Sequence, residues 1–153
     1  MRRSEPESRS IPMAYWLLKS EADTWSWDQQ KKECRKGAEW GGVRNFQARN
    51  NMRAMKKGDF GFFYHTGDEK RVVGIVKVVK EAHPESTDPT GQWECVDVAA
   101  VADLPSPVTL TEIKAEPKLK SMVLVRNSRL SVQSVTEAEW RKVCAMGCIA
   151  DPP

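Results

Sequence analysis

Residues that could bind a nucleic-acid base gather in one short stretch of the chain, residues 40–53. Trp40 stands before two glycines, where the backbone can turn tightly and a ligand can come close. Asn45 and Gln47 follow with amide groups that can hydrogen-bond to the edge of a base, as Ser20 could from an earlier segment. Single-stranded or flipped bases are held by stacking on rings and by such edge contacts. The stretch therefore predicts a pocket for a base or a similar polar ligand.

Basic side chains near this stretch could neutralise phosphates, which accept hydrogen bonds from lysine, arginine and hydroxyl groups. We expect this role for four of them, Lys19, Arg44, Arg49 and Arg129. Two alternatives stay open: the arginines could form the solvated face of an amphipathic helix, or Arg49 could pair with an internal carboxylate such as Glu21. The formal net charge is only +3, so any binding of nucleic acid must depend on a local patch.

Few residues are suited to catalysis. The sequence contains no G-x-S-x-G elbow and no P-loop, and no spacing brings two carboxylates together. Histidine and glutamate can transfer protons, so His65 and Glu21 are the candidates if the protein is a small nuclease or hydrolase. That alternative requires both side chains to face one cavity. A histidine on the aromatic segment 62–65 is more often structural, and we expect no catalytic residue.

The four cysteines do not predict a metal centre. They are Cys34, Cys95, Cys144 and Cys148, with no C-x-x-C pair and only two histidines in the chain. Zinc sites use about four cysteine, histidine or carboxylate ligands at regular spacing, and Cys144 with Cys148 on one helix would supply at most two. We therefore expect buried reduced thiols, no metal and no cofactor.

Length and composition predict one soluble domain. The chain has 153 residues, 40% of them hydrophobic and 29% charged, which suits a single globular core. We expect a disordered tail over 1–13, a folded domain over 14–148 and a short tail over 149–153. No secretory signal or membrane-spanning run is visible, and we expect a cytoplasmic protein, or a nuclear one in a eukaryote.

Several strands and helices alternate irregularly along the chain, which fits an α+β domain better than a doubly wound sheet. Apolar runs predict strands over 15–19, 60–65, 72–79 and 93–101, and a strand-like run over 122–125. Proline and glycine predict a loop over 83–91. Capping boxes begin at Ser26, Thr109 and Thr136, so we expect helices over 27–35, after 109 and after 136, besides one over 44–55. We expect the core to hold Trp16, Trp27, Trp93 and Trp140.

Five motifs occur in the order found in the EVE domain family, which the chain resembles over residues 14–147. They are YWLLKSE at 15–21, W-x-x-VRNFQARN at 40–50, FFYH at 62–65, W-x-x-VDV at 93–98 and RLSVQ at 129–133. The resemblance implies a single PUA-like mixed β-barrel of five to six strands with three to four flanking helices, related to the YTH and ASCH domains. It also implies recognition of RNA or DNA that carries a modified base, without catalysis.

The resemblance also implies a set of binding residues. In the YTH readers of methylated adenine, a pair similar to Lys19 and Ser20 ends the first strand, and a tryptophan similar to Trp40 forms one wall of an aromatic cage. An arginine similar to Arg129 lies near the phosphate of the ligand. The other cage walls have no counterpart, because the loop over 81–91 holds no Trp, Tyr or Phe, so the identity of the base stays open. The expected base pocket consists of Ser20, Glu21, Trp40, Val43, Asn45, Gln47, Tyr64, His65 and Ser131.

The chain departs from the family pattern at three places. Ala22 and Ser134 stand where proline is usual, and the segment 83–85 reads His-Pro-Glu instead of Tyr-Pro-Asp. None of these positions belongs to the expected pocket. We therefore expect a monomeric nucleic-acid-binding domain, with a protein-interaction module as a third possibility if the surface around Trp40 is flat.

Overall fold

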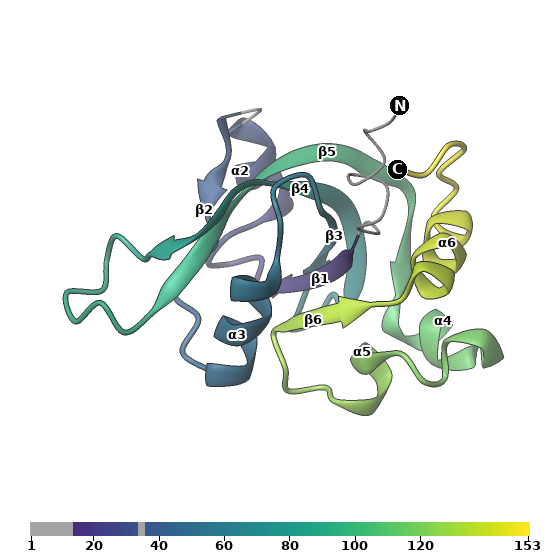
Figure 1. Ribbon diagram of the computed structural model, residues 1–153. Coiled ribbons are helices and arrows are strands. Elements are labelled where there is room, and N and C mark those ends of the chain that lie inside the picture. Colours follow the sequence, from purple (N-terminus) through teal and green to yellow (C-terminus); the bar gives the residue numbers. More distant parts are fainter. Residues whose placement is uncertain (1–13, 34–35) are drawn as a thin grey trace, which may run out of the picture.

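A single curved sheet organises the part of the chain that the computed structural model describes, residues 14–33 and 36–153 (Figure 1). Its six strands run in the order β2-β5-β4-β3-β1-β6. β1 is parallel to β3 and antiparallel to β6, so the sheet is mixed. The strands are β1 (Tyr15–Ser20), β2 (Ala38–Glu39), β3 (Phe60–His65), β4 (Arg71–Pro84), β5 (Glu94–Thr109) and β6 (Val132–Val135).

The two faces of the sheet pack against different helices, because alternate residues of a strand point to opposite sides. Trp16 and Leu18 of β1 enter one core, which we call the α3-side cluster, and Leu17 enters the other, the α6-side cluster. The α3-side cluster also contains Trp27, Trp40, Ala48, Met52, Met55, Phe63, Val73, Val76, Val78, Cys95, Val96, Val98, Leu130 and Val132. The α6-side cluster also contains Phe62, Tyr64, Val72, Ile75, Leu104, Val108, Ile113, Leu119, Met122, Leu124, Val135, Trp140, Val143 and Cys144.

The helices divide between the same two faces (Figure 1). α2 (Trp27–Lys32) and α3 (Phe46–Ala54) cover the α3-side cluster. On the α6-side cluster lie α4 (Leu110–Ala115), the 3₁₀ helix η2 (Pro117–Leu119), α5 (Val123–Arg126) and α6 (Glu137–Met146). All three expected capping boxes are present, at the starts of α2, α4 and α6.

The α+β class and the expected strands are confirmed, but some boundaries differ. β4 and β5 extend beyond 72–79 and 93–101, since register shifts let both strands bend and pass between the two clusters. The loop expected over 83–91 accordingly begins only after Pro84. The expected helix over 27–35 ends at Lys32, and its last two residues lie outside the described residues, as does the tail expected over 1–13.

The strand-like interpretation of 122–125 is wrong. This run forms α5, so the described residues contain five α-helices. A four-residue apolar run has no usable periodicity, and here it follows directly on η2, with the amide of Met122 donating to the carbonyl of Leu119.

The tryptophans and cysteines expected in the core are mostly buried, with Trp93 and Cys148 as exceptions among the described residues. Trp16, Trp27 and Trp140 are buried as expected, whereas Trp93 is only half-buried and belongs to neither cluster. Cys95 and Cys144 are buried free thiols, but Cys148 follows the end of α6 and is exposed. Cys34 lies outside the described residues. None of the described helices is long and apolar enough to cross a membrane.

Candidate functional site

A cavity of about 490 Å³ lies at the end of β1, next to the glycine turn that follows Trp40. It is lined by Lys19, Ser20, Glu21, Thr24, Trp25, Glu39, Trp40, Gly41, Gly42, Val43, Arg44 and Ser131. The structure therefore brings together five of the nine expected base-pocket residues, Ser20, Glu21, Trp40, Val43 and Ser131, and two of the four expected phosphate ligands, Lys19 and Arg44.

The floor of the cavity depends on three segments that are distant in sequence. Ser20 ends β1 beside its parallel partner β3, and its hydroxyl donates to the carbonyl of Trp25 at 2.6 Å. The backbone of Lys19 is tied to Ser131, whose carbonyl accepts from the Lys19 amide at 2.9 Å. The Lys19 ammonium donates to the carbonyl of Ser128 at 2.7 Å, and burial lowers its pKa. The Ser20 hydroxyl, the Lys19 ammonium and Ser131, which precedes β6, therefore lie around one base-sized cavity.

Trp40 is both a wall of the cavity and a member of the core. It is only 5% exposed, and its ring meets Phe63 edge to face with the ring centroids 5.3 Å apart. Its amide donates to the carbonyl of Val96 at 2.8 Å, which extends the contact of β2 with β5. The sequence pointed to a pocket residue rather than a core residue, and the structure assigns Trp40 to both.

The glycine turn is held in place by Glu85, which the sequence analysis did not single out. Both Glu85 oxygens accept from the Arg44 guanidinium, at 2.8 and 3.2 Å, and the same carboxylate accepts from the Gly42 amide and the Thr87 hydroxyl. These donors, Arg44 first, lower the pKa of Glu85 to about 2 against the opposing effect of burial. Gly42 has φ +80°, a conformation that favours glycine, so this turn needs both its glycine and its carboxylate anchor.

A stack of aromatic and guanidinium groups lies beside the turn. Phe46, which is 54% exposed, stacks on Trp93 with the centroids 4.9 Å apart. The guanidinium of Arg49 lies 4.8 Å from the Phe46 ring centroid and 5.5 Å from that of Trp93, and Arg44 lies 5.4 Å from Trp93. Arg49 donates to the carbonyl of Gln92 rather than to Glu21, so the alternative internal ion pair is not formed.

Two expected base-reading amides have other positions. Asn45 is the N-cap of α3, where its side chain accepts from the amide of Ala48 at 2.8 Å. Gln47 lines a separate hollow of about 260 Å³ that it shares with Asn51 and Arg126. Neither lines the cavity: the Asn45 side chain caps the first turn of α3, and Gln47 faces the other hollow.

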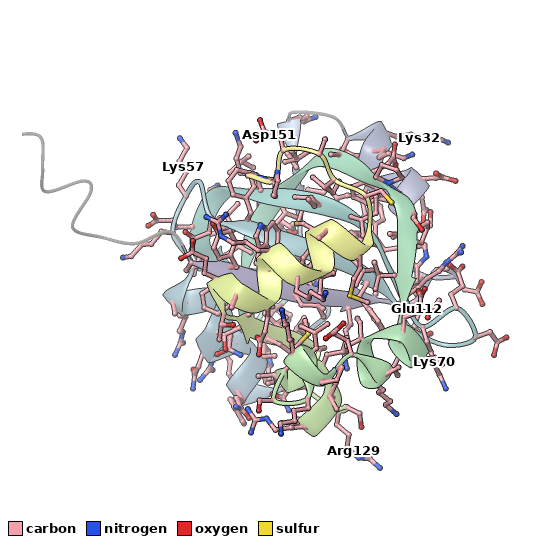
Figure 2. The ribbon with its side chains drawn as sticks, turned by 90° about the vertical axis from the view of Figure 1, so that its right-hand side faces the viewer. Lys32, Lys57, Lys70, Glu112, Arg129 and Asp151 are labelled. Carbon is pink, nitrogen blue, oxygen red and sulfur yellow. The ribbon has the colours of Figure 1, made fainter. Side chains whose placement is uncertain are left out.

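Three further expected site residues also lie outside the cavity lining. Tyr64 points to the α6-side cluster, where burial raises its pKa to about 12. His65 is 7% exposed, and its ring nitrogens contact the amide of Trp27 at 3.0 Å and a carboxylate oxygen of Glu69 at 2.8 Å. Arg129 is exposed and points away from the body of the molecule (Figure 2). His65 lines neither of the two hollows that Glu21 lines, whereas the hydrolase alternative requires a shared one.

Sequence reasoning missed five lining residues, Thr24, Trp25, Glu39, Gly41 and Gly42, although the two glycines had marked the turn. Trp25 is half-buried, and its indole N–H donates to Gln30 at 2.9 Å, which leaves the ring against the cavity. Its position five residues after Ser20, between the turn over 22–24 and the N-cap of α2, was the available signal.

Comparison with known proteins identifies the family. The model of the EVE domain matches residues 14–146. Thymocyte nuclear protein 1 of Gallus gallus is 36% identical over 172 residues, which cover 92% of this chain and 71% of that protein.

Solved structures agree with this result. A crystal structure of an Agrobacterium tumefaciens protein has 56% identity and a TM-score of 0.88, covering 92% of this chain and 97% of that one. Human THYN1 protein, crystallised in complex with 5-methylcytosine containing DNA, has 32% identity and a TM-score of 0.81, covering 92% and 99%. A YTH domain of Zygosaccharomyces rouxii shares the fold alone, at 14% identity and a TM-score of 0.57. With its PUA-like fold, its five motifs in order and a family match over nearly all described residues, the chain belongs to the EVE domain family.

Proposed function

We propose that this protein binds nucleic acid and holds one modified base in the cavity beside Trp40, without catalysing a reaction. The observation that carries the proposal is the meeting of Ser20, Trp40 and Ser131 around one cavity, with Lys19 at its side. The volume of about 490 Å³ lies within the range of small-ligand pockets and is ample for one extruded base. The human relative crystallised with 5-methylcytosine containing DNA supports the same class of ligand.

Within this proposal the sugar-phosphate backbone of the bound nucleic acid follows the basic groups in and beside the cavity. Lys19 lines the cavity, whereas Arg49 lies on the aromatic stack. Phe46 and Trp93 offer the stack as a platform for a base next to the extruded one, since every base has a ring face that can stack. Arg44 serves mainly to hold the turn, because its guanidinium is already paired with Glu85.

The test is binding to matched oligonucleotides that differ only at one base, cytosine against 5-methylcytosine and adenine against N6-methyladenine, each as DNA and as RNA. Fluorescence anisotropy with the full chain gives the affinities. We expect a preference for one modified base. Equal, weak affinity for every member of the panel would overturn the proposal.

A variant that fills the cavity sharpens this test. Ser131 lines the cavity and is half-buried, and within the described part of the chain its hydroxyl has no hydrogen-bond partner, so Ser131→Phe should fold and obstruct the base. Stacking is worth about 1–3 kcal/mol per base, so we expect affinity to fall roughly 5- to 150-fold. The matched control is Ser106→Phe, an exposed position of β5 next to the end of α6 and outside the cavity lining, and it should bind like wild type.

Salt dependence tests the phosphate contacts separately. Three neutralised phosphates on a single strand predict a slope of log affinity against log salt of about −2. Arg129→Ala should reduce the steepness by about 0.7 and weaken all sequences alike, because phosphate contacts carry no sequence information. An affinity that does not change with salt concentration would exclude contacts to phosphates and point to a free nucleoside as the ligand.

A further inference from the structure

Four side chains able to bind a metal ion meet on three adjacent strands, behind the wall of the main cavity. They are Glu39 of β2, His83 of β4, and Cys95 and Asp97 of β5. One ligand atom of each lies within 4.8 Å of the ligand atoms of the other three. None of the four residues is exposed, and Cys95 is 1% exposed.

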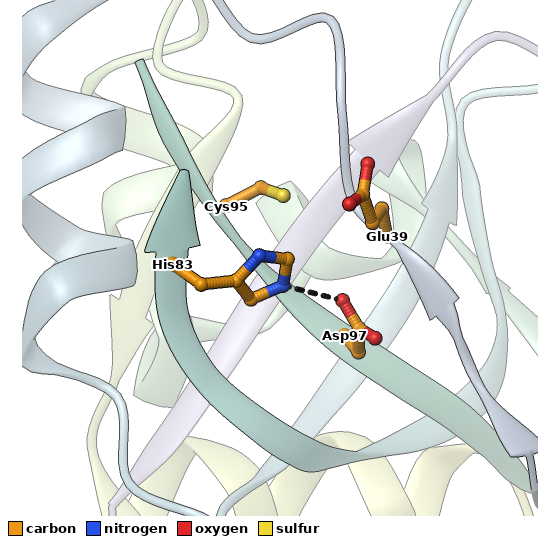
Figure 3. Close-up of side chains that lie close together, drawn as sticks. All are labelled: Glu39, His83, Cys95 and Asp97. Atoms are coloured by element: carbon orange, nitrogen blue, oxygen red, sulfur yellow. Dashed lines mark hydrogen bonds and ion pairs between the residues drawn. The ribbon is translucent and has the colours of Figure 1, made fainter. Parts of the chain in front are cut away.

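The sheet itself creates this arrangement. Glu39 lies opposite Asp97 in the register of β2 and β5, and His83 lies opposite Cys95 in that of β4 and β5. Cys95 and Asp97 are two residues apart on one strand, so both point to the same face. The four side chains therefore form two rows of two and point toward one another (Figure 3). Their separation in sequence explains why no spacing pattern indicated them.

The imidazole of His83 is oriented like that of a metal ligand. Its Nδ1 lies 3.0 Å from the carbonyl of Pro84, and its Nε2 lies 2.7 Å from a carboxylate oxygen of Asp97. A neutral imidazole has one N–H and can donate to only one of these oxygens. If Nδ1 donates to Pro84, the lone pair of Nε2 faces the cluster, which is the usual orientation of a histidine that binds a metal while its other nitrogen is held by a carbonyl.

The charge around the cluster also favours a cation. Within the described residues Glu39 forms no ion pair with lysine or arginine, and its hydrogen bonds are those from the amide and hydroxyl of Ser86. Cys95 is buried beside the carboxylates of Glu39 and Asp97. A bound cation would offset the repulsion between these two carboxylates and take the thiol as its thiolate.

We propose that Glu39, His83, Cys95 and Asp97 form a binding site for a divalent transition-metal ion, with zinc as the best fit. A thiolate and an imidazole suit zinc and its neighbours, whereas calcium and magnesium bind oxygen ligands. Zinc takes four such ligands at about 2.0–2.3 Å, which sets them roughly 3.3–3.8 Å apart in a tetrahedron. The cluster must contract slightly to reach this spacing, and the contact between His83 and Asp97 must open. Glu39 also lines the cavity, so the ion has a path from solvent.

The experiment uses the full chain after treatment with a chelator and titrates it with Co²⁺, which substitutes for zinc and has an absorption spectrum. We expect one Co²⁺ per chain, with the charge-transfer band of a thiolate–cobalt bond and the visible bands of a tetrahedral ion. Added Zn²⁺ should abolish these bands. No thiolate band in the wild type, or a band that Zn²⁺ leaves unchanged, would overturn the proposal.

Matched cysteine variants locate the ion. Cys95→Ser should lose the thiolate band, whereas Cys148→Ser, which removes an exposed thiol outside the cluster, should keep it. The opposite result would place the ion on a surface thiol and reject the site. Because Cys95 is buried, Asp97→Asn gives a second test that preserves side-chain shape. It should weaken binding by at least the roughly 10- to 100-fold typical of a lost outer partner, and unchanged affinity would reject Asp97 as a ligand. No oligonucleotide is involved, so this result is independent of the proposed base pocket.

Discussion

The two faces of the sheet use different means to reach a packed core. The α6-side cluster is held by contacts between apolar side chains, with Trp140 stacked between Tyr15 and Phe62 at centroid distances of 4.6 and 4.0 Å. On the α3 side, polar groups are buried and tied together: the Trp16 indole donates to Asp59 at 3.1 Å, and Glu85 holds the glycine turn. Burying polar groups costs free energy unless every group is bonded, so such a network is found where backbone segments must be positioned. One face stabilises the domain, and the other shapes a site.

The largest effect should come from the apolar face. Trp140→Ala removes a ring that is 0% exposed, and large-to-small changes of this type cost about 3–5 kcal/mol. We expect the free energy of unfolding in urea to fall by this amount, while the folded fraction binds oligonucleotide with unchanged affinity. Trp140→Phe retains part of the stack and serves as the milder control. A loss of affinity greater than the unfolded fraction of the protein explains would contradict the idea that the α6-side cluster contributes only to stability.

An intermediate effect, on both stability and binding, is expected from Glu85→Gln. The change keeps the shape but removes the charge that holds Arg44, whose side chain is 44% exposed, so we expect a loss of about 1–3 kcal/mol. Affinity for the base should fall as well, because the turn after Trp40 loses its anchor. The matched control is Glu81→Gln, which makes the same change at an exposed position of β4.

The same carboxylate predicts a pH dependence. The pKa of Glu85 lies at about 2 in the folded protein and near 4.5 when the chain is unfolded, so its contribution is complete above about pH 4.5. That contribution should be lost as the pH falls from 4.5 toward 2. Urea unfolding of wild type and Glu85→Gln at several pH values should therefore show the difference between them shrinking in acid. A constant difference would mean that the carboxylate is not ionised preferentially in the fold.

The smallest effect is expected at Asn45. Asn45 is the N-cap of α3, so Asn45→Ala should lower the free energy of unfolding by about 1 kcal/mol. Asn45→Asp should retain most of the stability, because aspartate caps equally well. Preference among bases should stay the same in both variants. A changed base preference with unchanged stability would restore the role that the sequence suggested.

The sequence predicted those features whose causes are local. The capping boxes and the strands over 15–19 and 60–65 follow from neighbouring residues, and a cavity lies beside the glycine turn that the sequence marked. The anchoring of that turn could not be predicted, because Glu85 is 41 residues from Arg44 and only the fold brings them together. The capping role of Asn45 was not predicted for a related reason: an amide before a helix can cap it or bind a ligand, and the residue type alone does not distinguish these roles.

The position of β1 has a consequence for how the protein is made. β1 pairs with β3 and also with β6, the last strand of the chain, so Leu18 meets Val132 across more than a hundred residues. Contacts between distant parts of a chain slow folding, because a large loop must close before they form. During synthesis the floor of the cavity cannot assemble until β6 has emerged from the ribosome. If translation ended before residue 132, the chain would therefore contain every strand except β6 but could not form the floor of the cavity.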